Sequence, residues 1–188
     1  MPNSCILSGP NGNLRLWCFE TGARGDFDGD YFTSLSPISV LGIRELCVGH
    51  SSMSFFWPNP WGLTVTGVCE AFGILTKVED LTIVGCHTRP FSEALGMAMD
   101  GGILLPALRR LTIYVFYGDL DIIDLIQCAR MRKECSRPLG EVTIVFEEAA
   151  TTDLALKVEL LGEFVGEVKH RVGEAPMLIW KGLDCDDW

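Results

Sequence analysis

A short pattern of apolar residues recurs along this chain and limits the folds that it can adopt. Each copy has an apolar residue, two variable residues, a second apolar residue, one variable residue and a third apolar residue. The four copies are Ile43–Val48, Val78–Ile83, Leu108–Ile113 and Leu139–Ile144. Their central residues lie 35, 30 and 31 positions apart, and the second copy continues to Cys86 in the form of a leucine-rich-repeat strand. We therefore expect one strand in each repeat.

Segments of helical character follow these strands. Asp119–Glu134 has acidic residues in its early turns and basic residues in its last turn, the order that the helix dipole favours. Asp153–Val172 has apolar residues at alternating spacings of three and four, which predicts one long helix packed on the sheet. Ser92–Met99 and Gly62–Leu75 are weaker helix candidates. Because strands alternate with helices, we expect the four strands to be adjacent, parallel and in sequence order, with right-handed crossovers.

The two ends of the chain depart from the repeat. Cys5–Leu7 and Leu14–Phe19 flank a Gly-Pro-Asn-Gly turn, which predicts a β-hairpin that caps the first repeat. Met177–Trp180 is a candidate last strand before an acidic tail. The predicted fold is α/β: a short leucine-rich-repeat-like right-handed solenoid with a parallel sheet and an N-terminal hairpin. One domain then spans residues 1–188, with the hairpin and a loop in 1–35, four repeat units in 36–150, and a terminal helix and acidic tail in 151–188.

Composition excludes several classes of protein. The chain is 48% hydrophobic, as expected of strands buried on both faces, and its longest stretch without a charged residue, Leu46–Cys69, contains Pro58 and Pro60 and cannot be a membrane-spanning helix. The net charge of −10 opposes wholesale nucleic-acid binding, which needs a basic face. No signal peptide is visible at the N-terminus. We therefore expect a cytoplasmic or nuclear protein that binds neither membranes nor nucleic acids.

The eight cysteines predict neither disulfides nor a metal site. No two cysteines form a CxxC pair, and the three histidines stand apart, whereas a zinc site needs ligands paired at short spacing. Free thiols that pack as small hydrophobic groups are the expected state. We predict no metal and no cofactor.

Motifs that carry catalysis are also missing from the sequence. There is no G-x-S-x-G motif, and the glycines of Gly9–Gly12 lack the lysine of a phosphate-binding loop. The acidic run Asp26–Asp30 lacks the later residues of a calcium loop, and the aromatic loop Phe55–Trp61 is expected to pack over the core. Gly162 and Gly166 are expected to allow close helix packing. Because catalytic triads assemble from distant residues, a small Cys or Ser hydrolase stays open as an alternative, which an esterase and reactive-thiol screen would test.

The stretches Leu105–Tyr114, Asp124–Gln127 and Pro138–Ile144, together with the opening Leu7–Leu16, resemble the C-terminal repeat region of fungal F-box proteins. In that family an N-terminal F-box docks on a Skp1-type adaptor of a cullin ubiquitin ligase, and the repeats recruit a substrate. The resemblance therefore implies a substrate-recruiting repeat region. Because no F-box-like segment precedes the repeats here, we expect the isolated chain not to bind a Skp1-type adaptor, which would require an F-box upstream.

Stacking the four repeats places their variable residues in columns on one face of the sheet. In such a solenoid the consensus apolar residues point inward and the intervening residues point to the concave face. The predicted binding residues of the first column are Glu45, Asp80, Arg110 and Glu141. The second column begins with Cys47 and contributes Thr82, Thr112 and Thr143, and the third column contributes Tyr114. Good strand formation explains the threonines, but it does not explain the charges.

These observations favour a non-catalytic scaffold that binds an unidentified protein through its concave sheet. One alternative keeps the fold and treats the chain as a truncated or vestigial family member without a function of its own. The hydrolase is the third possibility. Binding of a protein partner, loss of all function and catalysis would each leave the same repeat pattern, so the sequence keeps all three open.

Overall fold

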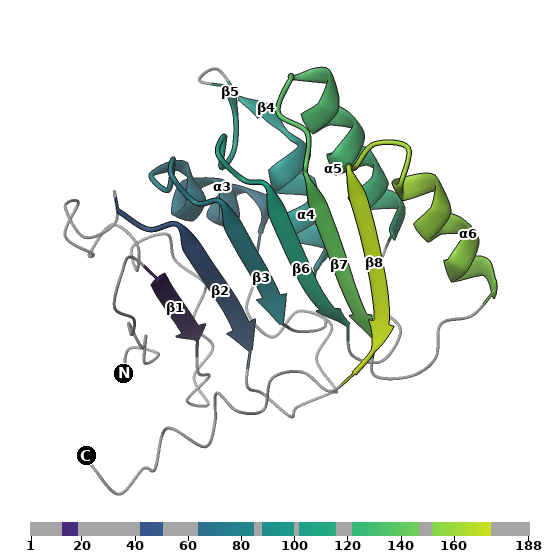
Figure 1. The fold of residues 1–188 in the computed structure, drawn as a ribbon. Helices are drawn as coiled ribbons and strands as arrows, with labels where there is room; N and C mark the ends of the chain where they lie inside the picture. The colour runs from purple at the N-terminus through teal and green to yellow at the C-terminus, as the bar shows by residue number, and fades with distance from the viewer. Residues whose placement is uncertain are drawn as a thin grey trace, which may run out of the picture.

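The computed structural model describes residues 13–18, 42–50, 64–84, 88–99, 102–115, 122–146 and 152–173 (Figure 1). A parallel sheet of six strands, in the order β1-β2-β3-β6-β7-β8, makes up one layer of this part of the chain. Figure 1 shows helices α3, α4, α5 and α6 together on one side of the sheet. The strands are β1 (Asn13–Cys18), β2 (Glu45–His50), β3 (Asp80–Val84), β6 (Arg110–Val115), β7 (Glu141–Phe146) and β8 (Glu167–Val172).

The four predicted strands are confirmed as β2, β3, β6 and β7, adjacent, parallel and in sequence order. The central apolar residues form one register column, since Leu46 pairs with Leu81, Leu81 with Leu111, and Leu111 with Val142. All four are buried beneath the helices. The apolar pattern of the sequence therefore predicts both the pairing and the inward face of the central sheet.

A ladder of backbone hydrogen bonds joins the turns that lead into these strands. The carbonyl oxygen of Arg44 accepts from the amides of Glu79 and Asp80, and the carbonyl of Glu79 accepts from Arg109 and Arg110. The carbonyl of Arg109 in turn accepts from the two residues that open the next strand, Gly140 and Glu141. Each repeat thus fixes the start of the following strand with the same pair of bonds.

Helices follow the strands where the sequence predicts them, with shifted boundaries. They are α3 (Val65–Gly73), α4 (Arg89–Gly96) and α5 (Ile122–Glu134). The hydroxyl of Thr64 caps α3 by accepting from the Gly67 amide at 3.0 Å. Pro90 lies in the first turn of α4, where its missing N–H costs no hydrogen bond, and the helix begins three residues before the predicted Ser92. The first residues of the predicted helix Asp119–Glu134 lie outside the described residues.

The predicted helix Asp153–Val172 is wrong in its second half. Helix α6 (Thr152–Leu161) ends before Gly162, and β8 follows as a strand parallel to β7. Val165 and Val168 repeat the apolar spacing of the other units, and β-branched residues fit a strand better than a helix. The pattern was hidden because His170 occupies the third apolar position, opposite Ile144. The segment assigned to a terminal helix thus contains a fifth strand of the repeat series.

The first and last predicted strands have different outcomes. Residues 13–18 do form a strand, but β1 pairs in parallel with β2 at the edge of the sheet. The other arm of the predicted hairpin, Cys5–Leu7, and the predicted strand Met177–Trp180 both lie outside the described residues. A feature that the sequence did not predict, the antiparallel pair β4 (Ala98–Met99) and β5 (Gly102–Ile103), lies between α4 and β6.

Gly166 allows close backbone contact at the start of β8, not the helix packing predicted from its spacing to Gly162. A Cβ atom added at Gly166 would lie 2.7 Å from the carbonyl oxygen of Gly140, closer than any van der Waals contact. The Gly166 amide donates to the Leu139 carbonyl at 3.1 Å, so the backbone cannot move away without losing this bond.

Gly166→Ala is therefore expected to lower the free energy of unfolding by about 1–3 kcal/mol, the usual cost of overpacking. Gly73→Ala is the matched control, because a Cβ there meets nothing within 4 Å and alanine is the better helix former. Urea denaturation of both variants measures the difference. Equal stability of the two would show that β8 does not approach β7 this closely.

Candidate functional site

The face of the sheet that points away from the helices carries the predicted binding residues. We call this surface the open face and define it by two rows of side chains. The first row runs along the strand starts and contains Glu45, Asp80, Arg110, Glu141 and Glu167. The second row contains Cys47, Thr82, Thr112, Thr143 and Lys169. No described helix or strand lies over these rows (Figure 1).

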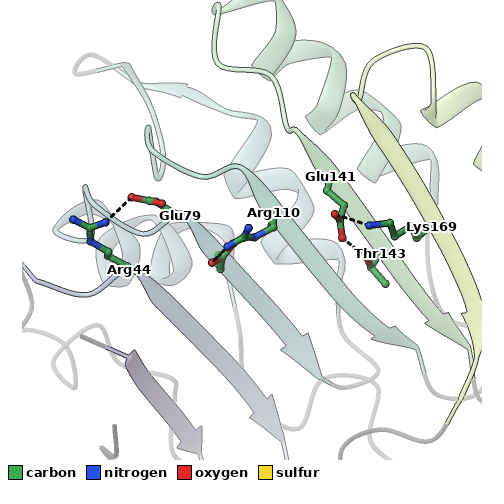
Figure 2. A network of polar contacts seen from close by, with 7 residues as sticks. Arg44, Glu79, Arg110, Glu141, Thr143 and Lys169 are labelled. Atoms are coloured by element: carbon green, nitrogen blue, oxygen red, sulfur yellow. Dashed lines mark hydrogen bonds and ion pairs between the residues drawn. The ribbon is translucent and has the colours of Figure 1, made fainter. Parts of the chain in front are cut away.

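The first row carries charges of both signs, with Arg110 between acidic residues, and ion pairs hold Asp80, Arg110 and Glu141 (Figure 2). Arg110 binds Asp80 on the neighbouring strand with two parallel hydrogen bonds, from Nε to Oδ1 and from Nη2 to Oδ2. This bidentate contact with the Asp80 carboxylate raises the pKa of Arg110 above its ordinary value. Arg110 stays largely exposed, so the pair orders the row without burying it.

Glu141 is engaged on its other side, by the fifth repeat. Lys169 Nζ donates to Glu141 Oε2 at 2.8 Å, and Thr143 Oγ1 donates to Oε1 at 3.1 Å (Figure 2). These bonds hold the pKa of Glu141 below its ordinary value of 4.5, and the same contact raises the pKa of Lys169. Because the folded state favours the carboxylate, this contact is kept above pH 4.5 and is lost as the pH falls through the lowered value.

The two carboxylates beside Arg110 have different partners. Within the described residues the hydrogen bonds of the Arg110 side chain go to Asp80, while Glu141 is neutralised by Lys169. Sequence reasoning missed Lys169 because the segment was assigned to a helix. The signal that could have found it is the fifth copy of the apolar spacing, Val165 and Val168.

The third predicted column is less open than the other two. Tyr114 pairs with Val84 on one side and with Val145 on the other, and both valines are buried although they do not belong to the helix-covered core. Tyr114 itself is half-buried. The exposed part of the face is therefore the charged row and the threonine row, bordered by Tyr114.

Two buried cysteines are unfavourable nucleophiles. Cys69 and Cys128 are free thiols enclosed in the core. Burial raises the pKa of Cys69, and it raises that of Cys128 to about 12, which leaves these two sulfurs protonated at neutral pH. Within the described ranges, no group of three or more His, Cys, Asp or Glu side chains could hold a metal ion.

Comparison with known proteins gives no match for this chain. No family model, no curated protein and no solved structure matches the chain. No helix in the described part of the chain has the length and apolar character needed to cross a bilayer. The open face is the surface on which a functional proposal can rest.

Proposed function

We propose that this chain is a non-catalytic protein-binding scaffold, folded as a short leucine-rich-repeat-like solenoid, that binds a partner protein through its open face. The observation that carries the proposal is the one-sided placement of the helices. Parallel sheets are normally covered on both faces, whereas here a row of ordered charges lies on the face that no helix of the described ranges covers (Figures 1 and 2).

The repeated start of each strand supports the solenoid. The carbonyl at the equivalent position of each repeat accepts hydrogen bonds from two amides at the start of the next strand. The apolar columns stay in register across β2, β3, β6 and β7. Each unit contacts its neighbours, as in a repeat protein, so the array presents its variable residues at a fixed spacing. A spacing of about 4.8 Å between neighbouring side chains suits recognition of an extended surface.

The charge order supports protein recognition over a merely solvated face. Asp80 and Arg110 are fixed by two hydrogen bonds, and Glu141 is fixed by Thr143 and Lys169. Ordered charges of both signs steer a partner into one register and reject others, which gives specificity more than affinity. Tyr114, on the far side of the threonine row, supplies an aromatic side chain of the kind that dominates binding energy at interfaces.

The resemblance to fungal F-box proteins extends the proposal to a class of partner. A repeat region of that kind recruits a protein substrate for ubiquitin transfer, and the open face would hold that substrate. The link to a ligase depends on an F-box and is separate from the binding role of the face.

Partner binding is expected to fail in open-face variants. Proximity labelling identifies candidate partners, and the binding of Tyr114→Ala and Arg110→Glu is then compared with that of Glu163→Lys, an exposed change after α6. We expect Tyr114→Ala to weaken binding at least tenfold, since truncation of an interface aromatic can cost about 2 kcal/mol or more, and Arg110→Glu to weaken it by reversing a charge. Glu163→Lys should bind normally. Loss of binding in Glu163→Lys alone would refute the open face as the site.

A further inference from the structure

The outer edge of β8 has backbone groups that no described strand pairs. β8 is the last strand of the described sheet, and it lies at the outer edge in Figure 1. The amide of Glu167 donates to the Gly140 carbonyl at 2.9 Å, and the amide of Gly173 donates to the Phe146 carbonyl at 2.9 Å. Because N–H groups alternate in direction along a strand, those of Val168, His170 and Val172 point away from β7. An edge of this kind is a template for another strand.

The side chains of this edge are also unusually accessible. Val172 is 59% exposed and His170 is exposed, although both occupy positions that are buried on the neighbouring strand β7. An added strand would therefore find apolar surface on the helix side of the edge. On the open-face side it would find Lys169 and Arg171.

One exposed cation at this edge, Arg171, has no ion-pair partner among the described residues. Lys169 is shared between Glu141 at 2.8 Å and Glu167 at 3.2 Å. Arg171 makes no ion pair or hydrogen bond with any residue of the described ranges. A carboxylate on an added strand, placed beside Arg171, would pair with this cation as Asp80 pairs with Arg110 on two neighbouring strands of the sheet.

We propose that the β8 edge binds an extended segment of a partner protein by strand addition, and that this segment alternates apolar residues with acidic ones. The apolar residues pack beside Val168 and Val172, and an acidic residue pairs with Arg171. A second copy of this chain is a poor occupant, because antiparallel pairing of two β8 strands would bring Lys169, His170 and Arg171 of both copies together. This edge shares Glu167 and Lys169 with the open face, but its outward amides and Arg171 do not belong to the two rows that define that face, so the two proposals can be tested separately.

The probe for this experiment is the blocked peptide Val-Glu-Val-Glu-Val-Glu-Val, which reads the same in both directions and so allows either strand polarity. The full chain, labelled with nitrogen-15, is titrated with the peptide and followed by NMR. We expect saturable shifts centred on β8, with a Kd below about 1 mM. A peptide with lysine in place of glutamate should bind at least tenfold more weakly.

The matched variants separate strand addition from general attraction. His170→Pro removes one outward amide but no bond to β7, as an edge position allows, and is expected to abolish the shifts. His170→Ala keeps the amide and should bind as the unmodified chain does. Arg171→Glu should reverse the preference between the two peptides. Circular dichroism checks that each variant is folded. If His170→Pro does not fold, the charge reversal in Arg171→Glu still tests the proposal.

Three results would overturn the proposal. They are the absence of saturable shifts, equal binding by His170→Pro and His170→Ala when both are folded, and dimers of the chain paired through β8 in solution. Tyr114→Ala is expected to leave peptide binding unchanged. If the open-face proposal is wrong, Tyr114→Ala will bind the partner protein as the unmodified chain does. If the edge proposal is wrong, the peptide titration will show it.

Discussion

Replacing Arg132 with methionine is expected to lower the free energy of unfolding by roughly 2–5 kcal/mol. Arg132 has no exposed surface, and its guanidinium donates to the carbonyls of Leu104 at 2.8 Å and Leu105 at 2.9 Å. A third, longer contact of 3.5 Å reaches the Leu108 carbonyl. Methionine fills a similar volume but donates nothing, so the carbonyls of Leu104 and Leu108 would lose the guanidinium as donor, and the Leu105 carbonyl would keep only its bond from the Leu108 amide. The residue therefore holds together the segment between β5 and β6.

Two opposing effects set the size of this loss. Burial of the guanidinium costs free energy, and the same burial lowers the pKa of Arg132 below its ordinary value. Removing the charge recovers that cost in part. The carbonyls remain, however, and each buried acceptor left without a donor costs about 1–3 kcal/mol. Leu105 adds to the loss, because its φ of 48° is unfavourable for leucine and the bond from Arg132 helps to hold it.

Arg130→Met is the control for Arg132→Met. Arg130 lies on the same helix α5 and is exposed, and its one ion pair with a described residue joins it to the exposed Glu134 at 3.7 Å. Its replacement should change the free energy of unfolding by no more than about 0.5 kcal/mol. Urea denaturation measures both variants, and a loss in Arg132→Met no larger than in Arg130→Met would contradict the bonds to the β5–β6 segment.

Arg132 also shows where sequence reasoning reached its limit. Basic residues in the last turn of a helix are expected to be exposed and to stabilise the helix dipole, which suits Arg130 and Lys133. Arg132 differs because its position on α5 faces the loop that begins at β5, a contact across more than twenty residues. The pattern within α5 carries no information on that loop, so the burial could not be predicted.

The central strands could be predicted because their consensus apolar residues all face the core. The inward residues of β2, β3, β6 and β7 are apolar at every consensus position, and the register follows directly from aligning them. The outward charges of the candidate site follow from the same alignment. β8 could not be recognised in this way, since an edge strand can carry His170 at an inward position where a central strand carries isoleucine. For that reason the sequence did not predict Lys169 as a residue of the candidate site.

Leu81→Ala and Leu111→Ala are each expected to lower the free energy of unfolding by roughly 2–5 kcal/mol. The two leucines are register partners on β3 and β6, and each is 1% exposed beneath the helices. Each truncation removes buried methyl groups and leaves a cavity that the rigid parallel ladder on both sides cannot close. Leu156→Ala removes the same atoms from a side chain that is 63% exposed on α6, so it should change stability by less than about 0.5 kcal/mol. Because Leu81 and Leu111 are register partners on adjacent strands, the spaces left by the two truncations would merge, and the double variant should lose less than the two single losses combined. If either single variant lost no more stability than Leu156→Ala, that leucine would not face the core. The assignment of the open face would then be wrong as well.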